Sequence, residues 1–171
     1  MSKKHKSFET ERLLIQPTSE EDAAFILKLL NTPKWIQYIG DRKVHSVEEA
    51  KVYIKERMLP QLEKLGYSNY TVIRKSDGEK LGTCGLYDRD GLKGIDIGFA
   101  FLSQFEKKGY AFESVSKLLD VAIRDFKLKE INAITTKDNI ASQKLLTKIR
   151  MTFKKMVSIP NDDKELMLYT L

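Results

Sequence analysis

The alternation of apolar and polar residues predicts an opening strand followed by two capped helices. Residues 8–16 alternate as a strand does, and Pro17 closes it. Each helix is opened by a predicted capping box, Thr18 with Glu21 and Ser46 with Glu49. Apolar residues then recur at helical spacing: Ala23, Ile26, Leu27 and Leu30 in the first helix, and Ala50, Ile54, Met58 and Leu62 in the second. Pro60 should bend or interrupt the second helix.

The middle of the chain changes to the period of strands. Residues 67–74 and 80–88 flank the turn sequence 76–79, so they predict a hairpin. After a turn at Asp90 and Gly91, residues 95–101 place apolar side chains on one face and small or acidic ones on the other. Gly98 lies inside this strand, where glycine favours a bulge or a close approach, so we expect a bend there that exposes backbone N–H groups.

The clearest helical pattern follows this strand. Its apolar face comprises Ala111, Val115, Leu118, Leu119, Ala122, Ile123 and Phe126. At its entrance, Gly109 and Ala111 leave the backbone unshielded, and the free N–H groups of the first turn favour an anion. Lys107 and Lys108 add positive charge that suits a phosphate or diphosphate. The alternative interpretation is a lysine-rich surface loop before an ordinary helix.

The C-terminal third predicts strand, helix and two further strands. Residues 131–136 form a short buried strand beside the bent one, and residues 140–149 form a helix with Ala141, Leu145 and Ile149 inward. Asn139 stands at the cap position, where its side chain either closes the helix or faces a ligand. Residues 152–159 and 164–171 predict two strands joined by the turn 160–163.

Composition limits the class of protein. The 171 residues are 42% hydrophobic, which predicts one domain over residues 8–171 after a mobile basic tail of residues 1–7. The sequence lacks a membrane-length apolar stretch and a secretory signal pattern, so we expect a cytoplasmic protein with no membrane partner. His5 and His45 are far apart, so no metal site is expected. The net charge of +6 fits a polyanionic cofactor, a ribosomal neighbour or simply a lysine-rich surface.

The element order and four stretches of the chain resemble the GNAT N-acetyltransferases, in particular the RimJ/RimL branch that acetylates ribosomal-protein N termini. These stretches are ETERLLIQPTSEEDA, YIGDRKVHSVEEA, IDIGFAFLSQFEKKGYAFES and DNIASQKLLTKIRMTF. The resemblance implies an α/β (α+β) fold. Its mixed, mostly antiparallel sheet has about seven strands, splayed at the cofactor cleft, with helices on both faces. It further implies transfer of the acetyl group of acetyl-CoA to a primary amine on a protein N terminus or a small molecule, with a homodimer as one possible assembly.

The resemblance also implies site residues. The loop Glu106–Ala111 corresponds to the one that holds the cofactor's pyrophosphate on backbone amides, and the strand at Phe99–Phe101 to the one that pairs with pantetheine. The implied cofactor-binding residues are Phe99, Ala100, Phe101, Lys107, Lys108, Gly109, Tyr110, Ala111, Asn139 and Ser142. Three positions depart from the family pattern: Glu106 stands in place of Gln or Arg, Leu146 in place of a proton-donating tyrosine, and Arg150 in place of glycine. Ser142 is then the candidate acid by analogy, with Tyr110 as an alternative.

The remaining catalytic residues leave alternatives open. Asp96 lies on the polar face of its strand, where it is either a general base, acting directly or through water, or a solvated carboxylate. Trp35 and Tyr38 are spaced to share a helical face, as walls of a substrate pocket or as plain core. Cys84 is expected to be buried filler. Two rival classes are a non-catalytic CoA-binding sensor and a basic nucleic-acid-binding module. The second is disfavoured, so no direct nucleic-acid binding is expected, because most aromatic residues alternate into the core.

Overall fold

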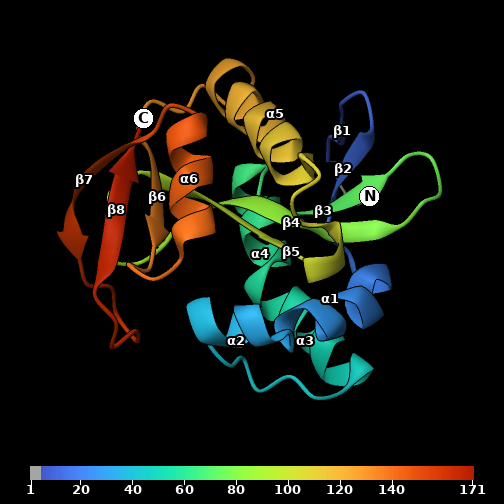
Figure 1. Ribbon diagram of the computed structural model, residues 1–171. Helices are drawn as coiled ribbons and strands as arrows, with labels where there is room; N and C mark the ends of the chain where they lie inside the picture. Colours follow the sequence, from blue (N-terminus) through green and yellow to red (C-terminus); the bar gives the residue numbers. More distant parts are fainter. Residues whose placement is uncertain (1–4) are drawn as a thin grey trace.

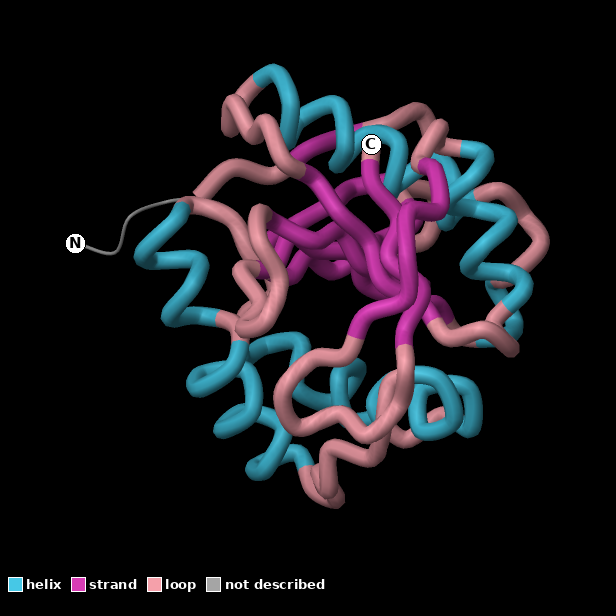
Figure 2. Tube along the Cα trace, turned by 90° about the vertical axis from the view of Figure 1, so that its left-hand side faces the viewer, coloured by secondary structure: helices cyan, strands magenta, loops and turns pink. Residues whose placement is uncertain are grey.

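The computed structural model describes residues 5–171 and places one eight-stranded sheet at the centre of the molecule (Figures 1 and 2). In sheet order the strands are β1 (Phe8–Glu9), β2 (Leu13–Pro17), β3 (Asn69–Arg74), β4 (Lys80–Tyr87), β5 (Ile95–Phe101), β6 (Ile131–Thr135), β8 (Leu166–Thr170) and β7 (Thr152–Val157). Every neighbouring pair is antiparallel except β5 with β6. The eighth strand arises because a turn divides the predicted opening strand, with Thr10 N–H donating to the Leu13 carbonyl.

Within residues 5–171, six α-helices surround this sheet: α1 (Ala23–Leu30), α2 (Pro33–Tyr38), α3 (Val47–Arg57), α4 (Leu59–Leu65), α5 (Tyr110–Arg124) and α6 (Ile140–Lys148). Short 3-10 turns precede α1 (η1, Glu20–Asp22) and α5 (η2, Ser103–Phe105). In Figure 1, α5 lies above strands β4 and β5 and the helices α1–α3 lie below them, so the predicted fold class is confirmed. No helix within residues 5–171 has the length and apolar character that crossing a bilayer requires.

Helix α5 packs its apolar stripe on the sheet as the sequence predicts, with one exception. Val115, Leu118 and Ala122 are fully buried in the main core, whereas Ile123 is 43% exposed, so the prediction that it faces inward is wrong. The buried stripe instead includes Ser114, whose hydroxyl donates to the Tyr110 carbonyl at 2.9 Å. A polar residue is tolerated at this depth because its hydrogen bond is satisfied within the helix.

The first predicted cap is wrong by one residue. Ser19, not Thr18, accepts the hydrogen bond from Glu21 N–H through its side chain. The Asp22 carboxylate in turn accepts from Ser19 N–H at 3.0 Å. Thr18 turns inward instead and shares a hydrogen bond with Thr71 across the sheet at 2.9 Å. Two adjacent hydroxyl residues have equal capping chemistry, and tertiary packing decides between them.

Three further expectations about helices have mixed outcomes. Ser46 caps α3 as predicted, accepting from Glu49 N–H at 3.1 Å, although the Glu49 carboxylate accepts from His45 N–H rather than from Ser46. Pro60 coincides with the break between α3 and α4, as expected. Ala141 is exposed rather than inward, because α6 turns Leu146 and Ile149 to the core.

The predicted bend at Gly98 involves no bulge in the pairing of β5 with β4. Pairing of β4 with β5 runs without a register shift from Gly82–Phe101 to Tyr87–Asp96, so β5 keeps a regular ladder through Gly98. Glycine is needed there for another reason, since a Cβ atom would lie 3.0 Å from the Tyr87 ring. The opening is on the other side of β5, where the pairing with β6 stops after Asp96–Asn132.

Candidate active site

The splayed edge of β5 presents unpaired backbone groups. Ile95 N–H donates toward β6, to the Glu130 carbonyl, and Leu102 N–H donates toward β4, to the Leu81 carbonyl. Because successive residues of a strand turn their N–H groups to opposite edges, Phe99 and Phe101 direct theirs to the edge that β6 has left. Ala100 directs its N–H to β4. Of the three predicted residues, Phe99 and Phe101 therefore place backbone donors at the opening, whereas Ala100 can contribute only its side chain there.

Residues 106–111, here called the phosphate loop, form the second wall of this opening. Lys107, Lys108 and Gly109 are exposed, and the loop turns through left-handed conformations at Lys107 (φ 59°) and Gly109 (φ 82°). Within the part of the chain that the structure describes, no hydrogen bond occupies the backbone N–H groups of these three residues. The first turn of α5 adds further free N–H groups and the positive end of a fifteen-residue helix.

Glu106 is neutralised by a residue that the sequence interpretation overlooked. Its carboxylate forms an ion pair with the ammonium of Lys34 on α2, so its charge does not act alone on an anion at the loop. Lys107 and Lys108, its neighbours in the chain, form no ion pair with it among the described residues. No local pattern predicts the pairing, because the two residues are 72 positions apart.

The side chain of Tyr110 faces away from the opening. It is 8% exposed, its hydroxyl accepts from Arg74 at 3.3 Å, and the Arg12 guanidinium lies 4.3 Å from its ring centroid. A hydroxyl held in this way is poorly placed to protonate a leaving thiolate. The backbone N–H of Tyr110 remains part of the helix entrance.

Helix α6 forms the wall opposite the phosphate loop. Asn139 caps it, accepting from Ser142 N–H at 3.2 Å, which is the first of the two uses predicted for this residue. Ser142 is partly buried and lies one turn before Leu146 on the same helix face, and Leu146 is 1% exposed. The apolar residue predicted in place of the family tyrosine is therefore part of the core.

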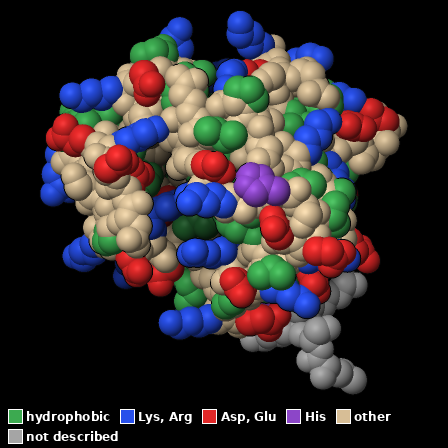
Figure 3. All heavy atoms as spheres, turned by 90° about the horizontal axis from the view of Figure 1, so that it is seen from below, with side chains coloured by type: hydrophobic (Ala, Val, Ile, Leu, Met, Phe, Trp, Pro, Cys, Tyr) green, Lys and Arg blue, Asp and Glu red, His purple; other side chains and the backbone are tan. Residues whose placement is uncertain are grey.

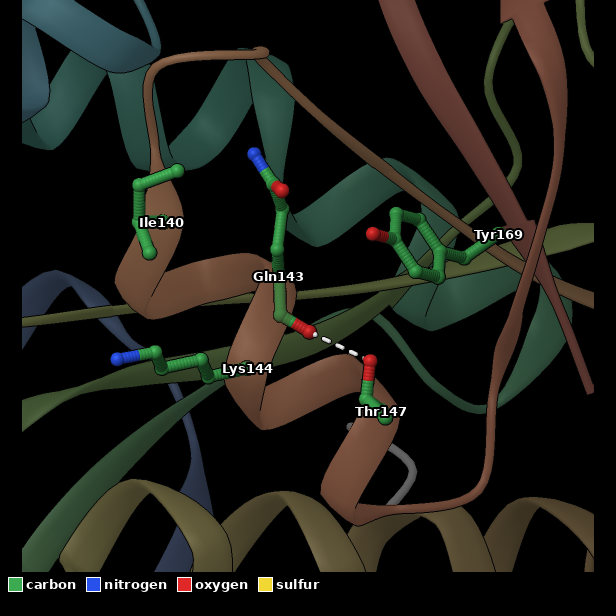
Figure 4. Close-up of a pocket in the computed structure, with 5 residues that line it drawn as sticks. All are labelled: Ile140, Gln143, Lys144, Thr147 and Tyr169. Atoms are coloured by element: carbon green, nitrogen blue, oxygen red, sulfur yellow. Dashed lines mark hydrogen bonds between the residues drawn. The ribbon is translucent and has the colours of Figure 1, made fainter.

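A separate hollow lies on the other side of α6. It measures about 350 Å³ and is lined by Ile140, Gln143, Lys144, Thr147 and Tyr169 (Figure 4). The four helix residues follow a three-and-four spacing that turns them away from Ser142 and Leu146. The hollow contains none of the predicted site residues, so we do not assign the chemistry to it.

Asp96 lies at the vertex where β5 and β6 separate. It is 2% exposed, so the alternative of a solvated carboxylate is wrong, and it accepts from the Arg89 guanidinium at 3.2 and 3.4 Å. Burial raises the pKa of Asp96 above its usual value, and Arg89 partly opposes this increase. Beside the pair, the Tyr87 hydroxyl donates to Asn69 at 2.6 Å, and burial raises the pKa of that phenol.

The predicted pocket residues Trp35 and Tyr38 lie on α2. Both are partly buried, and Trp35 packs against the main core and against a smaller core between the helices α1 and α3. Its indole N–H is buried without a hydrogen-bond partner among the described residues. The last turn of α2 also meets the β7–β8 loop, where Lys164 Nζ donates to the Gln37 carbonyl at 2.5 Å. Seen from below the view of Figure 1, the surface of the molecule has a hollow with an apolar floor, and Lys and Arg side chains border it (Figure 3).

Cys84 has no chemical role in this arrangement. It is fully buried in the core beneath α5, and burial raises the pKa of its thiol to about 12. A thiol in that environment stays protonated near neutral pH and is a poor nucleophile. The expectation of buried filler is confirmed.

The sheet opens between β5 and β6, and α5 begins beside this opening, as the resemblance to the GNAT N-acetyltransferases implies. Residues 12–152 match the family described as the acetyltransferase (GNAT) domain. The chain therefore belongs to the GNAT acetyltransferase family and is an N-acetyltransferase.

Individual relatives agree with this assignment. The chain is 28% identical to the uncharacterized N-acetyltransferase YoaA of Bacillus subtilis (strain 168), over 86% of this chain and 82% of that protein. It is 30% identical to the uncharacterized N-acetyltransferase p20 of Bacillus licheniformis, over 82% and 79% respectively. Its fold matches that of RimL, a ribosomal L7/L12 alpha-N-protein acetyltransferase in complex with coenzyme A. That match has a TM-score of 0.81 and 18% identity, and it covers 97% of each chain.

Proposed function

We propose that this N-acetyltransferase transfers the acetyl group of acetyl-CoA to a primary amine by direct attack in a ternary complex, without an acyl-enzyme. One observation carries the proposal: strand β5 parts from β6 just before Phe99, and the exposed amide entrance of α5 borders the same part of the sheet. An extended thioester arm needs backbone donors along its length, and a diphosphate needs several donors at one point. The two groups of unpaired N–H donors meet these needs.

The residues present fit such a cofactor. Phe101 would pair with the pantetheine arm through its N–H group, and Phe99 would direct its N–H to the thioester carbonyl. The N–H groups of residues 107–111 would hold the diphosphate, with Lys107 and Lys108 adding charge. Asn139 and Ser142 would contact the arm from α6. Acetyl-CoA supplies an activated thioester whose thiol, with a pKa near 8.5, departs readily as thiolate.

The chain's own groups would then move the protons. Asp96, at the vertex, would accept a proton from the ammonium of the acceptor, directly or through water, so that the neutral amine can attack the thioester carbonyl. The raised pKa of Asp96 makes it a stronger base than an exposed carboxylate. Phe99 N–H would stabilise the developing oxyanion, a contact worth a few kcal/mol. Ser142 would donate its hydroxyl proton to the departing sulfur and recover one from the attacking nitrogen, which loses a proton as the amide forms.

We infer that the acceptor is a protein N-terminal α-amine, as in the RimL branch. An α-amine has a pKa near 8 against about 10.4 for a lysine side chain, so a single partly paired carboxylate is sufficient as its base. The fold shared with RimL supports this acceptor class. The alternative acceptor is a small-molecule amine such as a polyamine, an antibiotic or a metabolite.

Two measurements test this function. Acetyl-CoA should raise the melting temperature and release heat in titration calorimetry, and the absence of both effects would remove the proposal. Thiol release should then be measured with three acceptor sets: peptides with a free N terminus and blocked lysines, peptides with a blocked N terminus and free lysines, and polyamines. Turnover with the first set alone supports the α-amine. Binding without turnover on any acceptor would indicate a CoA sensor instead.

A further inference from the structure

The turn between β1 and β2 is anchored to the first turn of α5. The Glu113 carboxylate accepts three hydrogen bonds from this turn: from Thr10 Oγ1 at 2.6 Å, from Arg12 N–H at 3.0 Å and from Arg12 Nε at 2.7 Å. Arg12 Nη2 completes an ion pair with the same carboxylate at 2.7 Å. Burial acts to raise the pKa of Glu113, but these bonds outweigh it and leave the pKa below its ordinary value. These three hydrogen bonds and the ion pair join residues more than 100 positions apart and fix the turn relative to the helix.

Arg12 also reaches the phosphate loop itself. Its Nη1 donates to the Lys108 carbonyl at 3.1 Å, and its guanidinium lies over the ring of Tyr110. A Cβ atom on Gly109 would come within 3.2 Å of Arg12 Nη2, so the loop backbone and the guanidinium are in close contact. One side chain therefore joins the β1–β2 turn, the loop and the helix entrance.

The hydrogen bond from Arg12 to the Lys108 carbonyl also determines where the next backbone N–H group points. A trans peptide holds its C=O and N–H antiparallel, so a Lys108 carbonyl that points to Arg12 turns the Gly109 N–H the opposite way. The charge of Arg12 is already matched by Glu113, and three of its nitrogen atoms donate to protein acceptors. Arg12 thus has little charge left for a ligand and acts on the backbone instead.

We propose that Arg12 is a positioning residue for diphosphate binding, holding Lys107–Gly109 in the conformation in which their N–H groups are available to the cofactor. This inference rests on the proposed function in assigning a diphosphate to the loop. Without Arg12, the exposed loop would sample other conformations, and the apparent affinity would fall with the fraction that remains competent. Ordering two residues fully upon binding corresponds to roughly 30- to 1,000-fold in affinity, and partial disorder of the free loop to correspondingly less.

The test compares R12Q with two other variants. R12K keeps a positive charge but cannot bond Glu113 and the Lys108 carbonyl at the same time. R124Q removes an ion-paired arginine at the far end of α5, where Arg124 pairs with Asp120 one turn before it. KM and kcat are measured with acetyl-CoA, and then with S-acetylpantetheine, a thioester that lacks the diphosphate. NMR order parameters of residues 107–109 are measured in the free proteins.

We expect KM for acetyl-CoA to rise at least tenfold in R12Q and by less in R12K, with kcat little changed and the rate with S-acetylpantetheine retained. The order parameters of residues 107–109 should fall in R12Q and not in R124Q. An unchanged KM, an equal loss with both thioesters, or unchanged order parameters would overturn the inference. If R12Q does not fold, R12K decides by the same readouts. Failure of wild-type protein to bind CoA would instead remove the proposed function, whereas the order parameters would still report on the loop.

Discussion

Replacing Arg89 with glutamine should leave the Asp96 carboxylate buried without its cation. Breaking a buried ion pair by removing one partner costs about 3–5 kcal/mol. Asp96 is 2% exposed but the Arg89 side chain is 33% exposed, so solvent screens part of the interaction and the lower end, about 3 kcal/mol, applies. For a domain of this size that corresponds to a fall in melting temperature of roughly 6–12 °C at neutral pH.

The loss should depend on pH in a defined direction. Loss of the Arg89 cation penalises the ionised form and therefore raises the Asp96 pKa further above its usual value. Since the folded protein then binds the proton more tightly than the unfolded chain, the destabilisation is absent at low pH. It develops as the pH rises from about 4 through the raised pKa and is complete above it. If Asp96 is the base, the acidic limb of kcat/KM moves to higher pH in R89Q.

Denaturant unfolding at several pH values, with the double variant R89Q/D96N, tests the reasoning. The neutral amide removes the buried charge, so the double variant should regain most of the stability that R89Q loses. D96N alone should abolish most turnover while the protein remains folded. A stability of R89Q within 1 kcal/mol of wild type, or a double variant no more stable than R89Q, would refute the picture of a buried charge held by Arg89.

Three other substitutions probe the walls of the opening. N139A should lose a helix cap worth about 1 kcal/mol and should lower turnover. N139D should restore the melting temperature but not the rate. If N139D restores both, Asn139 acts only as a cap. S142A should lower kcat by about tenfold with stability within about 0.5 kcal/mol, so a wild-type kcat would exclude Ser142 as the acid. K34Q should raise KM for acetyl-CoA up to about fivefold at low salt because it exposes the Glu106 charge, and E106Q should reverse this; a KM unaffected by either change would show that the pair does not act on the cofactor.

Local pattern predicted most of the fold. The apolar stripe of α5, the hairpin of β3 and β4, and the break at Pro60 follow from spacing and turn chemistry within a few residues. The predictions failed at two kinds of position. One is where neighbouring residues have similar capping chemistry, as with Thr18 and Ser19, and the other is at the margin of an apolar helix face, as at Ile123. These choices depend on what packs opposite, which the local sequence does not specify.

The sequence predicted the backbone donors of the candidate site but not its side-chain pairs. Glycine and lysine spacing indicated the amide entrance of α5, because backbone donors depend on local conformation. The side-chain half depends on pairs that are distant in sequence, Arg12 with Glu113 and Lys34 with Glu106, and neither partner carries a local signal. Asp96 was located correctly on its strand, but its burial depends on strands and loops that periodicity does not place.

The ion pairs around the phosphate loop determine which positive groups remain available to a ligand. Around the phosphate loop, Arg12 is matched by Glu113, Arg74 by Asp77, and Glu106 by Lys34, whereas no ion pair within residues 5–171 involves Lys107 or Lys108. The loop is therefore surrounded by pairs that add almost no net charge, and the unpaired donors that remain are backbone N–H groups and two ammonium groups. Under the proposed function, such a set would bind mainly through the geometry of its donors and less through net charge. We therefore expect it to favour a polyanion with several closely spaced oxygens, such as a diphosphate, over a single carboxylate.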